Sequence, residues 1–226
     1  MSKKNPIIFL KSDIEGGSTN WNHADKKKSF LSTFCLYFWI PYYEFPHRIY
    51  SSFIPPIFLD RYRRVYVDLL GPSLAILILS AILHYGHSNK HPDALVETSP
   101  IQALICYATF MPFLGFILSH LGQANISLLE MIALLGYGLY GHIFTFSFSL
   151  LFYHEKSNVF FFFCMSIFGG LSALRVALVL LKSIRIPAAR LIVCSIISTL
   201  QLLSLIFLHF AYMHRTFVYG VNKSNN

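Results

Sequence analysis

The sequence predicts an all-α integral membrane protein, a bundle of five transmembrane helices preceded by a short cytosolic N-terminal region. The first observation is a set of five long apolar stretches between Leu69 and Met213, separated by short polar hinges. The second is composition, because 55% of the 226 residues are hydrophobic and only 12% are charged, whereas soluble domains carry about 25% charged residues. A hydrocarbon core about 30 Å thick needs about 20 apolar residues per helix. The stretches therefore predict membrane spans rather than the core of a soluble enzyme.

The five expected spans differ in the charge that they contain. They cover residues 69–85, 101–121, 128–152, 159–181 and 191–213. The second and fifth contain no Asp, Glu, Lys or Arg, whereas the third contains Glu130 and the fourth contains Arg175. The hinges are too short to divide the bundle, so residues 68–214 are expected to form one membrane domain. An odd number of spans disfavours the paired-repeat plan of secondary transporters.

Residues 1–67 are predicted to form the cytosolic N-terminal region. The polar stretch 1–28 is expected to be disordered. The prolines within 29–67 exclude one long helix, so short helical or extended pieces are expected there. The aromatic run 30–40 is too short to span and is predicted to lie on the membrane surface or against the bundle. At the other end of the chain, residues 215–226 form a short tail.

The distribution of basic residues predicts the orientation in the membrane. Ten of the eighteen Lys and Arg residues precede residue 65, and the hinge 182–190 adds three more. The hinges 86–100 and 153–158 contain one Lys each. Because Lys and Arg are enriched on the cytosolic side of spans, we expect a cytosolic N-terminus and a C-terminus on the opposite side. The net charge of +8 is thereby explained by topology, and no nucleic-acid partner is expected.

Two further expectations depend on this orientation. Asn222 begins an Asn-Lys-Ser triplet in the tail and is a candidate N-glycosylation site, whereas the triplet at Asn125 lies in a hinge predicted to be cytosolic and should stay unmodified. The cluster Lys26, Lys27 and Lys28 has two interpretations that the sequence leaves open. It either attracts anionic membrane lipid or is a solvated basic stretch.

Glu130 and Arg175 are predicted to form an ion pair inside the membrane. Glu130 lies two residues into its expected span, and Arg175 lies six residues, about 9 Å, from the cytosolic end of its own. A lone charge in a bilayer is costly, so such residues find a partner or a polar cavity. Asp68 lies at the same level and could join them. The main interpretation is a clamp between helices. The alternative is a small transporter or channel that uses this level of Asp68, Glu130 and Arg175.

Small residues on the third and fourth spans predict close helix packing. They are Gly136, Gly138 and Gly141, interleaved with Tyr137, Tyr140 and His142, and then Gly169, Gly170, Ala173 and Ala177. Small residues let helix backbones approach closely, within one bundle or between subunits. A packing seam is the main interpretation, and a ligand site is the alternative.

Neither a metal site nor an enzyme is predicted. His84, His87 and His91 are spaced so that a helix would place them on one side, where they could bind zinc. They lie at the end of the first span, however, and Pro92 follows, so polar anchoring at the membrane surface is the preferred interpretation. The sequence has no HExxH, Gly-x-Ser-x-Gly or P-loop motif, and no cofactor is expected.

Two segments resemble signatures of the Yip-domain family. Residues 68–72, Asp-Leu-Leu-Gly-Pro, resemble its D-L-Y-G-P signature at the start of the first span. Residues 134–142, LLGYGLYGH, resemble its Gly-Tyr motif in the third span. Together with 169–175 and 208–212, these segments are similar to the branch of family member three. The resemblance covers residues 45–214.

The resemblance implies a five-span Yip domain in a Golgi or ER–Golgi membrane, with a cytosolic N-terminus and a lumenal C-terminus. It implies a non-enzymatic scaffold or adaptor in Golgi organisation and vesicle-mediated transport. The expected partners are another Yip-family membrane protein, in a hetero-oligomer, and a Rab-type GTPase. They are expected to meet a cytosolic face formed by 41–68 and the hinge 182–190.

The chain departs from the family pattern in two places. Leu70 stands where the family usually has Tyr, so the shape of the first motif matters more than a phenol there. The N-terminal region is short and basic, whereas the branch carries a long acidic one. Adaptor motifs of that acidic region are therefore not expected in this chain.

Overall fold

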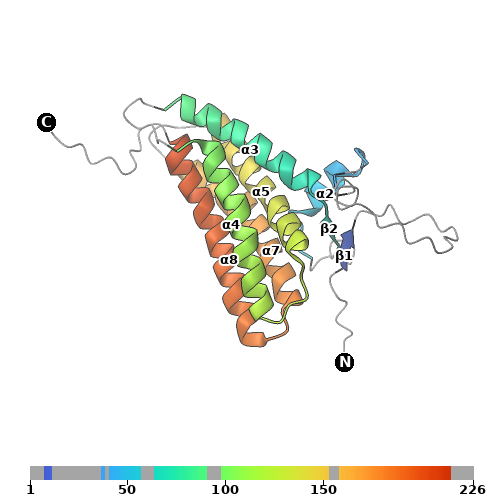
Figure 1. Cartoon of the computed structure of the whole chain (residues 1–226). Coiled ribbons are helices and arrows are strands. Elements are labelled where there is room, and N and C mark those ends of the chain that lie inside the picture. The colour runs from blue at the N-terminus through green and yellow to red at the C-terminus, as the bar shows by residue number, and fades with distance from the viewer. Residues whose placement is uncertain are drawn as a thin grey trace.

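Five long helices confirm the all-α membrane architecture. The computed structural model describes residues 8–11, 37–38, 41–56, 64–90, 98–152 and 158–214. Within these residues, the helices long and apolar enough to cross a membrane are Leu70–Ser88, Pro100–Leu121, Leu128–Leu151, Val159–Ser183 and Pro187–Met213. The first three are labelled α3, α4 and α5 in Figure 1. The five predicted spans are confirmed. Among their ends, the fifth differs most, since it begins at Pro187, which serves as an N-terminal helical residue.

The fourth and fifth spans each contain one π-helical turn. The fourth consists of α6 (Val159–Cys164), η3 (Met165–Gly169) and α7 (Gly170–Ser183). The fifth consists of α8 (Pro187–Leu208) and η4 (His209–Met213). The apolar pattern of a span does not distinguish a π turn from an α turn, so the sequence did not predict them.

Helix α5 is the central helix of the bundle. In its most apolar 18-residue stretch, 78% of the residues are buried, against 22–44% in the corresponding stretches of the other spans. It contacts α3, α4, α6 and α7, while α8 contacts α4 and α7. Figure 1 shows α3 inclined to α4 and α8, which run side by side. The middle of α5 is therefore where residues from several elements can meet.

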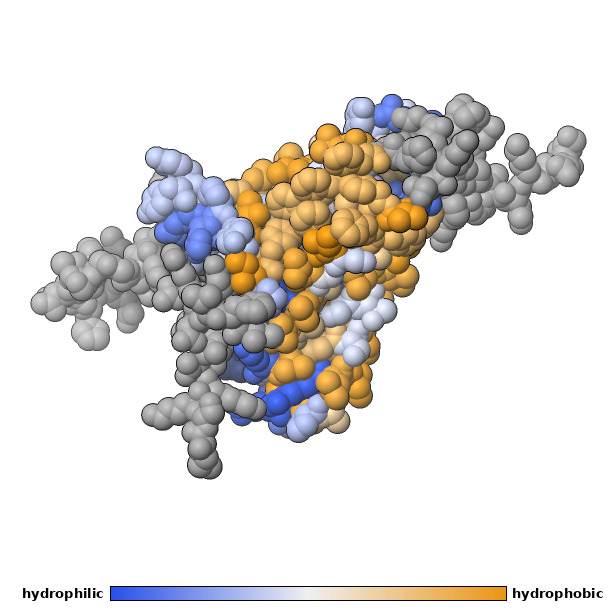
Figure 2. All heavy atoms as spheres, turned by 180° about the vertical axis from the view of Figure 1, so that it is seen from behind, coloured by the Kyte–Doolittle hydropathy of each residue, from blue (hydrophilic) through white to orange (hydrophobic). Residues whose placement is uncertain are grey.

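The outer surface of the bundle is apolar between polar ends. Figure 2 shows hydrophobic residues over the middle of the visible face and hydrophilic residues towards its ends. Large side chains such as Phe113, Leu191 and Leu203 are 56%, 66% and 55% exposed. Exposed apolar area on this scale is typical of a surface that faces hydrocarbon.

Short elements precede the bundle. Helix α2 (Phe45–Ser51) has Pro46 at its N-terminus, and strand β2 (Arg64–Val67) leads into α3. Strand β1 (Ile8–Lys11) pairs with β2 in parallel, from Ile8 opposite Arg64 to Lys11 opposite Val67. The sequence predicted short pieces around α2 and β2. No local pattern predicted β1, because its partner strand lies more than fifty positions away.

Several sequence-based expectations lie outside the described residues. They concern the basic cluster at 26–28, His91, the tail from residue 215 and the candidate glycosylation site Asn222.

Candidate functional site at the crossing of α3 and α5

The start of α3 and the middle of α5 interlock through two glycines. A Cβ at Gly136 would lie 2.4 Å from the Cβ of Pro72. A Cβ at Gly71 would lie 2.4 Å from the Cζ of Tyr137. Each helix thus contributes a glycine that makes room for a larger residue of the other. The two sequence motifs, 68–72 and 134–142, therefore meet in one contact.

Asp68 is the polar centre of this contact. Its side chain is 0% exposed. Its Oδ1 accepts a hydrogen bond from the backbone N–H of Gly71 at 2.9 Å. Its Oδ2 accepts from the hydroxyl of Tyr137 at 2.7 Å and from Nη1 of Arg48 at 2.9 Å. A carboxylate next to the first turn of α3 also interacts favourably with the helix dipole.

A second tyrosine extends the contact. The hydroxyl of Tyr140 donates to the carbonyl oxygen of Gly71 at 3.0 Å. The rings of Tyr137 and Tyr140 stack with their centroids 6.0 Å apart. Both tyrosines of the third-span motif therefore bond to the first motif, which gives their polar groups a structural role.

Arg48, on α2, is the partner of Asp68 that sequence reasoning missed. Its side chain is 5% exposed and also reaches Glu44, at 2.8 Å between Nη2 and Oε2. Burial disfavours the charge of Arg48, but the carboxylates of Glu44 and Asp68 outweigh it and raise the pKa of the guanidinium above its usual value. The guanidinium also lies 4.6 Å from the ring centroid of Tyr66. A lone Arg outside the spans gave no sequence signal for this pairing.

The predicted ion pair between Glu130 and Arg175 is wrong. Glu130 instead closes a capping box at the start of α5. Its Oε2 accepts from the N–H of Ser127 at 2.8 Å, and the hydroxyl of Ser127 accepts from the N–H of Glu130 at 3.3 Å. This Ser-x-x-Glu pattern satisfies two N–H groups that the first helical turn leaves unpaired. The carboxylate is therefore used locally.

Arg175 holds the C-terminal end of α2. Its Nη1 donates to the carbonyl oxygens of Ser51 and Ile54, the latter at 2.9 Å. A cation at this end of a helix satisfies free carbonyl groups and complements the dipole. The three charges that were predicted to lie together therefore have separate partners. Asp68 pairs with Arg48, Arg175 binds backbone carbonyls, and Glu130 caps α5.

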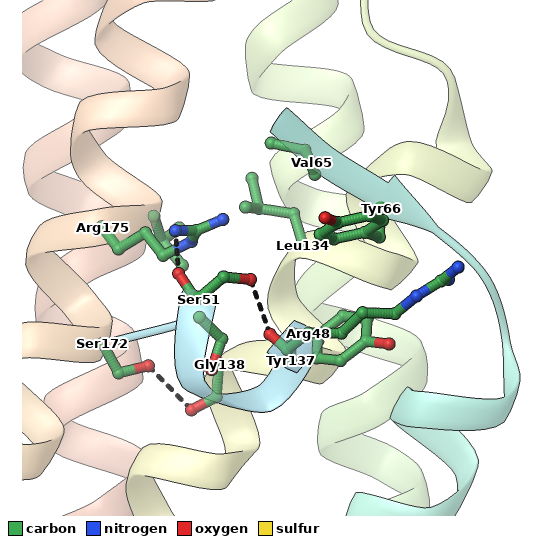
Figure 3. A pocket seen from close by; sticks show the side chains of 11 residues that line it. Arg48, Ser51, Val65, Tyr66, Leu134, Tyr137, Gly138, Ser172 and Arg175 are labelled. Atoms are coloured by element: carbon green, nitrogen blue, oxygen red, sulfur yellow. Dashed lines mark hydrogen bonds between the residues drawn. The ribbon is translucent and has the colours of Figure 1, made fainter. Parts of the chain in front are cut away.

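A cavity of about 20 Å³ lies between these groups. Figure 3 shows side chains of Arg48, Tyr137 and Arg175 around it, with Ser172 beside Gly138. This volume can hold one water molecule, whereas pockets for organic ligands measure about 300–1,000 Å³. The site is therefore a packed polar junction and not a ligand pocket.

The remaining glycines of α5 face the fourth and fifth spans. A Cβ at Gly141 would lie 2.7 Å from the Cβ of Ser172. The hydroxyl of Ser172 donates to the carbonyl oxygen of Gly138 at 2.8 Å and accepts from Nε2 of Gln201 at 3.2 Å. The seam on the third span therefore lies inside one bundle. For these glycines the sequence had left open packing within one bundle or between subunits.

The other predicted site residues are also internal, with one exception. His142 is 1% exposed, and its Nε2 lies 3.2 Å from the hydroxyl of Ser204. A Cβ at Gly169 would lie 3.2 Å from Leu205, and Ala173 is 3% exposed. At Gly170 the nearest atom that a Cβ would meet is 3.9 Å away, so this glycine is not required by packing. The described residues contain no group of three that could hold a metal ion.

Comparison with known proteins identifies the family of the chain. The family model described as the YIPF3 C-terminal domain matches residues 43–213. No solved structure matches the chain. The matched range contains α2, whose Arg48 completes the junction, as well as all five spans. The chain belongs to the Yip-domain family, as a membrane protein of the YIPF3 type.

Proposed function

We propose that the protein is a non-enzymatic scaffold or adaptor of Golgi or ER–Golgi membranes, where it acts in Golgi organisation and vesicle-mediated transport. In this proposal it works as a hetero-oligomer with a second Yip-family membrane protein. The carrying observation is that the two motifs bond to each other. The Asp68 carboxylate accepts three hydrogen bonds, from Gly71, Tyr137 and Arg48. The motifs thus join α3 to α5 inside the bundle, and in this proposal binding is left to the outer surfaces.

The alternative of a transporter or channel has less support. This alternative required Asp68, Glu130 and Arg175 to lie at one depth in the membrane and to line a common path for a substrate or ion. Glu130 is used in a cap at the surface of α5, and the cavity beside Arg175 holds about 20 Å³. Among the described residues, these three charges therefore do not share one path.

The proposed partner surface is the part of the cytosolic face named above that lies before α2, together with the hinge 182–190. Tyr42 and Tyr43, directly before α2, are 89% and 70% exposed. Arg185, in the hinge between α7 and α8, is exposed as well. Tyrosine and arginine are enriched at protein interfaces because they combine a large contact area with hydrogen bonding. A Rab-type GTPase is the second partner that we propose for this face.

A native purification tests the proposal. The full chain is tagged at its N-terminus, extracted in mild detergent, and its stoichiometric partners are identified by mass spectrometry. We expect a second Yip-family protein. The double variant Tyr42→Ser/Tyr43→Ser should lose much of it, whereas Tyr85→Ser, at the other end of α3 and 61% exposed, should retain it. Recovery of homo-oligomers without such a protein would contradict the proposal, as would fluorescence microscopy that finds the chain outside Golgi and ER–Golgi membranes.

A further inference from the structure

A second cavity, much larger than the polar junction, lies between α2 and the bundle wall. It measures about 460 Å³. Its lining includes Ile49, Tyr50 and Phe53 from the α2 segment, Phe144 of α5, Phe168 of η3 and Leu171 of α7. We propose that this groove, called the α2 groove below, binds one acyl chain of a bilayer lipid.

The lining excludes water as the occupant. A buried water needs two to four polar partners, and the side chains of the α2 groove present aliphatic and aromatic surface. Phe144 is in ring contact with Phe53 at 5.2 Å and with Phe168 at 5.9 Å between centroids. Such a surface is stable only against another apolar group.

The α2 groove continues the lipid-facing surface of the bundle. Phe148 lies one turn beyond Phe144 on α5 and stacks on Phe168 with centroids 5.1 Å apart. It is 38% exposed, and Leu174, on the same helix as Leu171, is 45% exposed. Both belong to membrane spans. The hydrocarbon that covers these side chains therefore borders the groove directly.

Helix α2 is held in place as one wall of the groove by polar bonds on its other side. Arg175 bonds the carbonyls of Ser51 and Ile54, and Arg48 pairs with Asp68. The groove is therefore preformed and does not depend on an occupant to separate its walls. Tyr50, which is 62% exposed, combines an apolar ring with a hydroxyl that suits the boundary between hydrocarbon and headgroups.

The volume favours an acyl chain over a helix of another protein. A helix with its side chains is about 10–12 Å wide and rises 5.4 Å per turn, so one turn occupies roughly 400–600 Å³. The α2 groove, at about 460 Å³, is thus no larger than a single turn, so a helix of another protein could not lie within it. A flexible chain of methylene groups can fill the same space along its length, and each buried methylene contributes about 0.8 kcal/mol.

Photo-crosslinking tests the proposal. The full chain is reconstituted into nanodiscs of phosphatidylcholine that contain a small fraction of phosphatidylcholine with a diazirine on one acyl chain. After irradiation, the labelled peptides are mapped by mass spectrometry. We expect label to concentrate on residues 45–53 and 165–171. Leu171→Trp should fill the groove and reduce labelling of 45–53 at least threefold. The matched control Leu203→Trp, on the exposed face of α8, should leave it unchanged.

Three outcomes would overturn the proposal. The first is labelling of 45–53 no stronger than that of the outer faces of α4 and α8, which would mean that exposure alone determines it. The second is unchanged labelling of 45–53 in Leu171→Trp. If this variant is not monodisperse, Leu171→Phe is used in its place. Finally, a co-purified protein subunit could abolish the labelling, which would assign the groove to that subunit. The inference rests on membrane embedding alone, so it can fail or hold independently of the scaffold proposal.

Discussion

The two ends of α3 stabilise a buried charge in different ways. Before its first turn, the Asp68 carboxylate pairs with the Arg48 guanidinium and accepts from Gly71 and Tyr137. After its last turn, Lys90 is 6% exposed, and its Nζ donates to the carbonyls of Ala211 at 2.7 Å and Phe210 at 3.4 Å. The first end thus joins opposite charges, whereas the second places a cation on the carbonyl end of the last span.

The direction of the pKa shifts follows from this difference. The two carboxylates raise the pKa of Arg48 although burial opposes its charge. Burial lowers the pKa of Lys90 below its usual value. The folded state therefore raises the pKa of the cation at the motif end and lowers the pKa of the cation at the opposite end. We therefore predict that substitutions at the motif end cost more stability than substitutions at the Lys90 end, and that the pH dependence of stability is larger at the Lys90 end.

Gly136→Ala should have the largest effect. Its Cβ would lie 2.4 Å from the Cβ and 3.1 Å from the Cα of Pro72, and the proline ring cannot rotate away. Overpacking costs about 1–3 kcal/mol and more where backbone must move, so we expect loss of the folded bundle. The measurement is the yield of monodisperse protein in size-exclusion chromatography. The matched control Gly170→Ala should fold normally, and equal yields of the two variants would refute the interlock.

Asp68→Asn should have the second-largest effect on stability. It leaves Arg48 buried without its main counter-charge, and breaking a buried pair costs about 3–5 kcal/mol. The control Glu44→Gln should cost at most about 1 kcal/mol because exposed ion pairs contribute little, and the Glu44 side chain is 41% exposed. Thermal unfolding in mild detergent measures both. A similar loss in the two variants would mean that the junction does not depend on Asp68.

Lys90→Met should cost less than Asp68→Asn. It removes hydrogen bonds from a charged group, the shorter of which at 2.7 Å contributes about 1.5–3 kcal/mol, but it also removes a charge that burial disfavours. The same unfolding assay ranks the two variants. If Lys90→Met were the more damaging, the contrast between the two ends of α3 would be reversed.

A smaller effect is expected from pH at the Lys90 end. Burial and the positive charge of Lys90 lower the pKa of His214 below 6.5. The unfolded chain therefore binds more protons than the folded chain below pH about 6.5, and stability should fall as the pH decreases from about 7 to 5. His214→Asn should flatten this part of the profile. The control His47→Asn, on α2 at the other end of α3, should not, and an unchanged slope in His214→Asn would exclude this residue as the cause.

The smallest effect should be the coupling between Glu130 and Arg175. Since their side chains have different partners, Glu130→Gln and Arg175→Gln should add within about 0.3–0.5 kcal/mol. A double-mutant cycle by thermal unfolding measures this. Coupling above about 1 kcal/mol would restore the ion pair that the sequence suggested.

The architecture could be predicted from the sequence because span length and the scarcity of charge are local properties. The cap formed by Ser127 and Glu130 could also have been predicted, since Ser-x-x-Glu before an apolar run is a recognised helix start. Treating Glu130 as a lone intramembrane charge hid this pattern. The long-range ion pair with Arg175 was preferred to this local cap, and that choice was wrong.

The junction itself could not be predicted from such patterns. Asp68 and Tyr137 are 69 positions apart, and Arg48 lies in a short helix that no periodicity marks. Arg175 bonds to backbone carbonyls, which every sequence offers equally. The resemblance identified the two motifs separately, but their contact depends on how α3 crosses α5.

The polar junction is tested most directly by asking whether the stabilising effect of the Tyr137 hydroxyl depends on the charged pair of Arg48 and Asp68. Tyr137→Phe is made in the native chain and in an Arg48→Met/Asp68→Ala background, in which both charges are replaced together so that neither is left unpaired. Thermal unfolding in mild detergent gives the loss of stability in each. We expect a loss of about 1.5–3 kcal/mol in the native chain, as for a hydrogen bond to a charged group, and almost none in the background. Equal losses in both would contradict it.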